Sequence, residues 1–190
     1  MQFKSYLIYS KNLDMEVDNE ELPGEFSLLV ISTIAEYHFA IESGYDFSSY
    51  PKNENIEFAL RKGAWLLCLF QERSLAHTTW LAHDHSQAVY DSLFFAGRIG
   101  VSRDAYIGPC NTYSPFRGRG LYPIALKLAC QNLKRRGAGR AFINTKQTNI
   151  ASIRGIRKAY FSKCGKAFVI SLLGRRFTHF EALKNINRII

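Results

Sequence analysis

Apolar residues recur along this chain at two different spacings, and the changes of spacing predict the order of its elements. Residues 4–9 favour a first strand, and an acidic loop follows it up to the break at Pro23-Gly24. We expect a helix over about 26–41 and a second helix that starts near Asn53 or Asn55 and stops at Gly63. Two apolar runs, 64–71 and 75–82, predict a hairpin of buried strands, whereas residues 83–100 suggest only a loop and an outer strand.

The second half of the chain alternates between strand and helix. Residues 104–112 predict a strand that Gly108-Pro109 bends or splays. Apolar residues at three- and four-residue spacing predict an amphipathic helix over 121–133, with basic residues 134–136 and the cap Gly137 at its end. A short strand at 141–144, a helix from Asn149 to about Phe161 and closing strands at 167–173 and 176–183 complete the pattern. The chain is therefore expected to form one α/β domain with a mixed sheet.

Composition narrows the class of protein. The chain has 190 residues, and 47% of them are hydrophobic, which fits one ordinary domain and excludes an intrinsically disordered chain. Its longest apolar run, 64–70, is too short to cross a bilayer, and no secretion signal is apparent at the start. The four cysteines lie far apart without a C-x-x-C pair, so free thiols in the cytoplasm are expected. His83-Asp84-His85 lacks a third ligand, and no metal site is predicted.

The charge of the chain is distributed unevenly. The formal net charge is +9, but residues 1–60 carry 11 acidic and 3 basic side chains, whereas residues 61–190 carry 5 acidic and 22 basic ones. Such an asymmetry indicates an anionic partner for the basic region, or a solvated face that opposes aggregation. Nucleic acid, an anionic membrane surface, a phosphate-bearing cofactor and an acidic carrier protein all fit the charge.

A short motif between the 104–112 strand and the 121–133 helix is the best candidate for a binding site. Its sequence is Arg117-Gly118-Arg119-Gly120-Leu121-Tyr122. Two glycines allow a tight turn and a close approach to a ligand, and the helix start that follows exposes free N–H groups. Together with two arginines, these groups predict a cradle for an anion, most naturally a diphosphate. The spacing differs from a Walker loop and from a dinucleotide-binding fingerprint.

This motif resembles the [Q/R]-x-x-G-x-[G/A] acyl-CoA loop of the GCN5-related N-acetyltransferase (GNAT) superfamily. Residues 149–161 resemble that family's N-x-x-[A/S]-x-x-x-Y-x-K-x-G-F segment, with Asn149, Ser152, Lys158 and Phe161 in register. The likeness covers about residues 60–185. It implies a mixed, mostly antiparallel sheet flanked by helices, with a splayed pair of central strands.

The resemblance also implies an activity, the transfer of an acyl group from acetyl-CoA or another acyl-CoA to the primary amine of a small molecule such as an amino sugar or amino acid. The pantetheine arm would lie where the strand ending near Thr112 splays from residues 141–144. The diphosphate would lie on residues 118–122, flanked by Arg117 and Arg119, and Asn149 and Ser152 would contact the acyl-bearing end of the arm. Asp104 and Tyr106 lie in the neighbourhood where some members place a general base.

Three positions depart from the family pattern. Tyr122 stands where the acyl-CoA loop usually has glycine or alanine, and it crowds the start of the helix. Ile156 stands where a tyrosine often protonates the departing thiolate, and isoleucine cannot do so. Tyr160 stands at a glycine position of the pattern, where we expect it to pack. The motifs therefore indicate acyl-CoA binding more firmly than they indicate a particular acid–base scheme.

Several alternatives remain open at this point. We expect residues 1–190 to form one domain, with the acidic N-terminal segment (residues 1–60) on the acceptor side and the basic segment (residues 61–190) as the acyl-CoA-binding core. The basic excess favours a variant in which acyl carrier protein donates a long acyl chain. A non-catalytic acyl-CoA-binding or nucleic-acid-binding module on the same fold is the third alternative, although no basic stretch interleaved with aromatic residues supports binding to nucleic acid. The acceptor, the acyl chain length and the oligomeric state are not indicated by the sequence.

Overall fold

The computed structural model describes residues 2–15, 20–52, 54–83, 103–172 and 175–181. Within these ranges the strands form one eight-stranded sheet in the order β2-β3-β4-β5-β6-β1-β7-β8. The strands are β1 (Gln2–Asn12), β2 (Phe26–Ile31), β3 (Trp65–Gln71), β4 (Ser74–Ala82), β5 (Asp104–Thr112), β6 (Arg140–Lys146), β7 (Ser162–Leu172) and β8 (Arg175–Glu181). The helices are α1 (Ile34–Glu42), α2 (Ile56–Arg61), the 3-10 turn η4 (Ser114–Phe116), α3 (Leu121–Arg135) and α4 (Ile150–Lys158).

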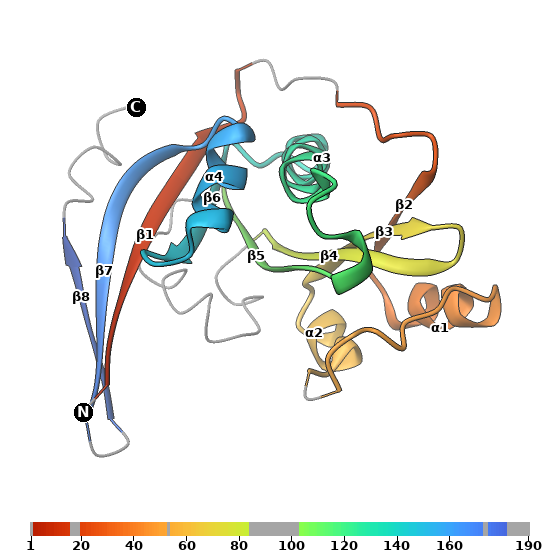
Figure 1. The fold of residues 1–190 in the computed structure, drawn as a ribbon, viewed down its shortest axis with the longest axis horizontal. Helices are drawn as coiled ribbons and strands as arrows, with labels where there is room; N and C mark the ends of the chain where they lie inside the picture. Colours follow the sequence, from red (N-terminus) through yellow and green to blue (C-terminus); the bar gives the residue numbers. More distant parts are fainter. Residues whose placement is uncertain (1, 16–19, 53, 84–102, 173–174, 182–190) are drawn as a thin grey trace.

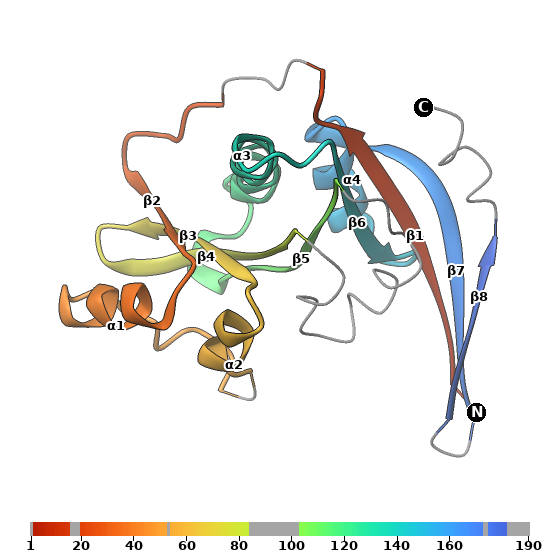
Figure 2. The ribbon, with the colours of Figure 1, turned by 180° about the vertical axis from the view of Figure 1, so that it is seen from behind.

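Helices cover both faces of this sheet (Figures 1 and 2). Helices α3 and α4 pack on one face, over a core that takes in Leu126, Leu133 and Ile156. Helices α1 and α2 pack on the other face, against β3 and β4. All neighbouring strands are antiparallel except β5 and β6, so the predicted mixed, mostly antiparallel sheet is confirmed. None of the described helices has the length and hydrophobicity that crossing a membrane requires.

The central strands β5 and β6 separate soon after they meet. They pair in parallel over three residues each, from Asp104 opposite Arg140 to Tyr106 opposite Phe142, although both strands continue for several residues beyond this point. The pairing between β4 and β5 also shifts register between Thr79 and Leu81. Figure 1 shows the two halves of the sheet diverging from the meeting point of β5 and β6. The predicted splayed pair of central strands is confirmed.

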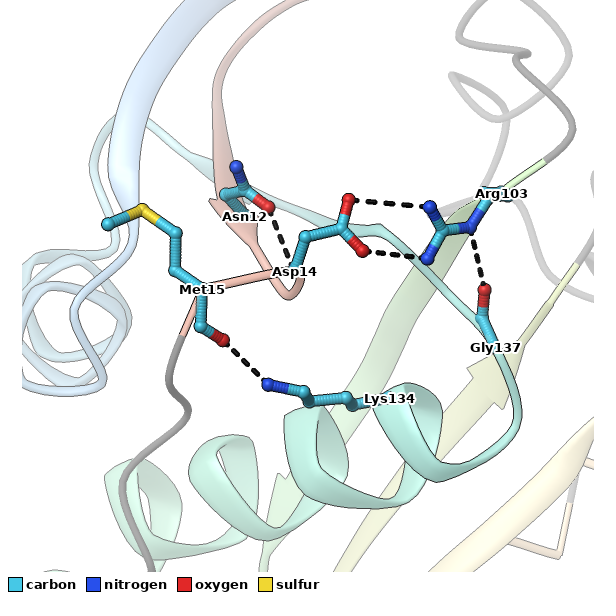
Figure 3. Close-up of polar contacts among 6 residues, drawn as sticks. All are labelled: Asn12, Asp14, Met15, Arg103, Lys134 and Gly137. Carbon is cyan, nitrogen blue, oxygen red and sulfur yellow. Dashed lines mark hydrogen bonds and ion pairs between the residues drawn. The ribbon is translucent and has the colours of Figure 1, made fainter.

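Strand β1 lies in the second half of the sheet, between β6 and β7. It pairs antiparallel with both, for example Tyr6 opposite Lys146 and Lys4 opposite Val169. Beyond its end, the chain is held against the C-terminal end of α3 and the start of β5 (Figure 3). Arg103 binds both carboxylate oxygens of Asp14 and the carbonyl oxygen of Gly137, and Lys134 donates to the carbonyl oxygen of Met15. Residues from the beginning of the chain therefore take part in the sheet beside the splay.

The helix ends carry the local signals that the sequence predicts. The side chain of Asn149 accepts a hydrogen bond from the Ser152 N–H and caps α4, and Asn55 caps α2 in the same way. Gly137, just past the end of α3, has a φ of 88°, which is favourable only for glycine. Helix α1 begins with a capping box in which Thr33 and Glu36 bond each other's backbone N–H groups.

The expected helix over 26–41 is wrong in its first half. Phe26–Ile31 is the edge strand β2, which pairs with β3 along its whole length, and only the segment after Thr33 is helical. Phe39 of α1 is exposed. The remaining strands and helices have the predicted order, with boundaries shifted by a few residues. The expected loop and outer strand within 83–100 fall almost entirely outside the described residues, as does the end of the strand predicted to reach 183.

Candidate functional site

A cavity of about 970 Å³ opens where β5 and β6 diverge. Its walls come from the second half of β5, the loop before α3, the last residues of β6 and one side of α4, with further residues from β1 and β7. The sheet is discontinuous here, because β5 and β6 no longer pair beyond Tyr106 and Phe142. A volume of this size is large enough to enclose most of a cofactor-sized molecule.

The glycine-rich loop forms one end of this cavity. Gly118 and Gly120 have φ angles of 79° and 76°, which an L-residue with a side chain adopts only at a cost. Gly120 is the N-cap of α3, and no side chain caps the first turn of that helix. The first backbone N–H groups of α3 therefore lack the side-chain acceptor that usually satisfies them, and Gly118, Gly120, Leu121 and Tyr122 all line the cavity.

The side chains of the two arginines in the loop lie in different places and have different partners. Arg117 lines the cavity, and its Nε donates to the carbonyl oxygen of Thr112, which fixes the guanidinium beside the loop. Arg119 does not line the cavity. Its guanidinium lies over the ring of Phe26 and binds Glu25 at 2.8 Å and the Gln71 side chain at 3.1 Å. Of the two arginines expected to flank a phosphate, Arg117 lies at the cavity, whereas the side chain of Arg119 is bound by Glu25 and Gln71 beside β2.

Tyr122 is accommodated by a glycine on the neighbouring helix. A β-carbon placed on Gly155 of α4 would lie 2.3 Å from Cδ1 of Tyr122, so the ring rests directly on the backbone of that helix. The hydroxyl of Tyr122 is 3.1 Å from that of Ser152. Burial raises the pKa of Tyr122, which stays a neutral phenol. The absence of a side chain on Gly155 therefore leaves room for the ring of Tyr122 beside α4.

Helix α4 contributes the second predicted group. Asn149 and Ser152 both line the cavity, as do Arg154 and Lys158 from the same helix. Ile156, at the position of α4 where a tyrosine acid is often found, is fully buried in the core shared with α3 and does not line the cavity. Seven of the eight residues expected to bind the donor therefore surround one cavity, and Arg119 is the exception.

No family model and no curated protein matches the sequence, so the comparison with known proteins rests on solved structures. Among solved structures, the tandem GNAT protein from the clavulanic acid biosynthesis pathway has a TM-score of 0.60 at 14% identity, over 86% of this chain and 51% of its own. A GNAT-family acetyltransferase from Colwellia psychrerythraea has a TM-score of 0.57 at 15% identity, over 96% of this chain and 57% of its own. The GCN5-related N-acetyltransferase from Sphaerobacter thermophilus has a TM-score of 0.54 at 13% identity, over 95% of this chain and 52% of its own.

The chain has the GNAT fold. At these identities the likeness shows the fold alone, and the chain spans only about half the length of these matched structures. The resemblance inferred from the two sequence motifs is confirmed at this level. Within the GNAT fold seen here, the cavity lies at the splay of the central strands.

The two candidate general bases lie outside the cavity lining. Asp104 forms a two-pronged ion pair with Arg140, both contacts at 2.9 Å, at the point where β5 and β6 pair. Tyr106 is buried with Phe142 on the face of the sheet opposite α3. Burial raises the pKa of Tyr106, so this phenol is protonated at neutral pH. The arrangement favours a structural role for Asp104.

The cysteines give no sign of nucleophilic chemistry. Cys110 lines the cavity, but burial raises its pKa to about 12, and burial also raises the pKa values of the Cys68, Cys130 and Cys164 thiols. A thiolate is therefore disfavoured at each of them. All four thiols are free, and among the described residues no group of three His, Cys, Asp or Glu side chains could hold a metal ion.

Sequence reasoning missed several residues of the cavity wall. Lys4 and Tyr6 line it from β1, Lys146 from the end of β6, and Val169 and Ser171 from β7. No local signal identifies these residues, because they reach the site only through the insertion of β1 between β6 and β7. The acidic N-terminal segment, expected on the acceptor side, thus contributes a lysine to the cavity.

Proposed function

We propose that this chain is a GNAT acyltransferase, in one domain over residues 1–190, that transfers an acyl group from acyl-CoA to the primary amine of a small molecule. Acetyl-CoA is the simplest donor. The observation that carries the proposal is the cavity at the splay of β5 and β6, which joins a loop of backbone N–H donors to a group of cationic side chains. A phosphate-bearing thioester with a long, narrow arm suits such a space.

Different parts of the cavity wall suit different parts of the acyl-CoA donor. The N–H groups at the start of α3 and the guanidinium of Arg117 suit the diphosphate. Asn149 and Ser152 suit the pantetheine arm, and the exposed edges of β5 and β6 offer peptide groups to its amides. A backbone N–H of the splayed β5 would polarise the thioester carbonyl.

The reaction forms a nitrogen–carbon bond and breaks the carbon–sulfur bond of the thioester. The amine must be uncharged to attack, so its ammonium form first gives up a proton, and the sulfur leaves as a thiolate. A free thiol has a pKa near 8.5, so the departing thiolate can leave without a strong acid at the position of Ile156. Free cysteines and an acyl-CoA donor are both consistent with a cytoplasmic setting for this reaction.

Donor binding is tested by titrating CoA into the wild type and two matched arginine variants. Arg117→Gln should weaken CoA binding about tenfold, because it removes one charge-assisted contact to phosphate. Arg119→Gln removes the same charge two residues away and should change the affinity by less than about twofold, since its guanidinium is bound to Glu25. Equal losses in the two variants, or no CoA binding by the wild type, would contradict this assignment.

Turnover with acetyl-CoA, a long-chain acyl-CoA and an acylated carrier protein, measured in parallel over a range of salt, identifies the donor. We expect release of free CoA thiol with a small-molecule amine. A carrier-protein donor would show faster turnover with that protein and a steep loss of rate as salt rises, because its encounter would depend on charge. Binding of acyl-CoA without product from any amine would instead indicate a non-catalytic module.

A further inference from the structure

The cavity is lined by five cationic side chains and, among the described residues, by no carboxylate. The five are Lys4, Arg117, Lys146, Arg154 and Lys158. Elsewhere some basic side chains are paired, for example Arg140 with Asp104, Lys127 with Glu20 and Arg119 with Glu25. None of the five has an ion pair with a described carboxylate. Unpaired charges of one sign around a cavity repel one another and attract an anionic ligand.

The five cations divide between the two faces of the sheet. Arg117 lies in the loop before α3, and Arg154 and Lys158 lie on α4, so these three are on the side of the donor loop. Lys146 is directly opposite Tyr6 in the β1–β6 pair, and Tyr6 packs with Tyr106 and Phe142 on the other face. Lys146 therefore projects on the face opposite α3.

Lys4 lies on that same opposite face. It is two residues before Tyr6 on β1 and is opposite Val169, which packs in the same cluster as Tyr6. Lys4 and Lys146 are thus diagonal neighbours on adjacent antiparallel strands, with β-carbons roughly 7 Å apart. Two lysines at this separation can direct their ammonium groups to one small anion.

We propose that Lys4 and Lys146 bind an anionic group, a carboxylate or a phosphate, carried by the amine acceptor. This inference rests on the proposed function, since it assigns the donor to the α3 and α4 side of the sheet. The donor diphosphate then lies at the glycine loop, on the other side of the splay. Lys4 and Lys146 remain available to bind the amine acceptor. An amine without an anionic group leaves the lysine pair uncompensated and binds more weakly.

Thermal unfolding in the presence of saturating CoA tests the proposal with matched probes. One pair is glucosamine 6-phosphate and glucosamine, and the other is phenylalanine and phenethylamine. At least one member that carries an anionic group should raise the melting temperature beyond the effect of CoA alone, and its counterpart without that group should not. Whether the phosphate or the carboxylate compound does so identifies the group. The Lys4→Gln/Lys146→Gln variant should lose this increment, with an affinity for the anionic probe about tenfold weaker.

The Lys163→Gln/Lys166→Gln variant is the control, because it removes the same charge from β7 at positions that do not line the cavity. It should keep the increment, and both double variants should keep the shift caused by CoA alone. Equal shifts from members with and without the anionic group, an increment that survives Lys4→Gln/Lys146→Gln, or no increment from either probe that carries an anionic group would overturn the proposal.

Two further results have separate meanings. If CoA alone gives no shift in the wild type, the proposed function fails and the acceptor proposal fails with it. If succinyl-CoA binds more tightly than butyryl-CoA, and this preference depends on Lys4 and Lys146, the anion belongs to the acyl group. That outcome would overturn the assignment to the acceptor while leaving the donor site intact.

Discussion

The ring of Tyr122 occupies the space that a β-carbon on Gly155 would fill. The two residues lie on different helices, Tyr122 in the first turn of α3 and Gly155 in the middle of α4. A β-carbon at residue 155 would be 2.3 Å from Cδ1 and 2.8 Å from Cε1 of the ring. Since both residues line the cavity, their contact sets how closely α3 and α4 approach at the donor site.

Gly155→Ala should destabilise the wild-type protein by about 1 to 3 kcal/mol, because the ring cannot be compressed and must move. The displaced ring should also weaken CoA binding. In the background Tyr122→Ala the same substitution should stabilise the protein by up to about 1 kcal/mol, because alanine is the better residue in the middle of a helix. Urea unfolding of the four proteins in this cycle measures the reversal of sign. Equal changes in the free energy of unfolding in both backgrounds would show that the two residues do not interact.

Asp104→Asn separates a structural role from a catalytic one. The ion pair with Arg140 is largely buried, and the loss of its charge-assisted hydrogen bonds should lower the free energy of unfolding by about 2 kcal/mol. Because Asp104 does not line the cavity, the turnover rate at saturating substrate should change by less than about threefold. Loss of a general base would instead cost on the order of a hundredfold or more in rate. Steady-state kinetics beside chemical unfolding tells the two apart.

Tyr160 sits in a left-handed backbone conformation, with a φ of 63°. This conformation explains why the motif that residues 149–161 resemble has glycine at this position. Lys11 and Lys127 lie over the ring of Tyr160, at 5.4 and 5.1 Å from its centroid. Tyr160→Gly should be more stable than Tyr160→Ala by about 1 kcal/mol, since both lose the ring but only glycine relieves the backbone strain. Tyr160→Phe keeps both features and should match the wild type in thermal unfolding; equal stability of the glycine and alanine variants would argue against strain.

His77 is a buried neutral group that makes stability depend on pH. Its Nδ1 is 2.7 Å from the Thr112 hydroxyl and its Nε2 is 2.7 Å from the Thr79 hydroxyl, and burial lowers its pKa to about 3. The usual value in an unfolded chain is near 6.5. Between these values the unfolded state binds one more proton than the native state, so stability falls as the pH falls, by about 1.4 kcal/mol per pH unit.

Chemical unfolding of the wild type and His77→Gln between pH 7 and pH 4.5 measures this contribution. The variant should be less stable at pH 7, and the gap should narrow as the pH falls, because only the wild type loses the contribution of His77. His38→Gln is the control, since that side chain is exposed and bound to Glu57. Parallel pH curves for wild type and His77→Gln would contradict the neutral, buried state of His77.

Local signals in the sequence account for the elements of the fold that could be predicted. Helices α3 and α4 follow from apolar spacing, from the cap Asn149 and from Gly137, all of which act within a few residues. The glycine loop is likewise a local feature. Phe26–Ile31 was predicted incorrectly because its apolar residues also suit a helix, and pairing with β3 decides its conformation.

Features of the site that depend on distant regions of the chain could not be predicted. Arg119 does not line the cavity, and its guanidinium is bound by Glu25, 94 residues earlier. Lys4 reaches the cavity because β1 inserts between β6 and β7, and no spacing in the sequence indicates that insertion. The division into an acidic acceptor segment and a basic donor segment describes charge along the chain, whereas the cavity draws on both.

The position of β1 in the sheet also determines how late in synthesis the sheet can form. Its partners lie far along the chain, since Tyr6 pairs with Lys146 and Phe3 with Ile170. A ribosome adds roughly 5–20 residues per second, so Tyr6 waits about 7 to 28 s before its partner is even synthesised. During that interval β1 has to remain unpaired, and the second half of the sheet cannot close. Chaperones that shield exposed strands on nascent chains would therefore protect β1 during this interval.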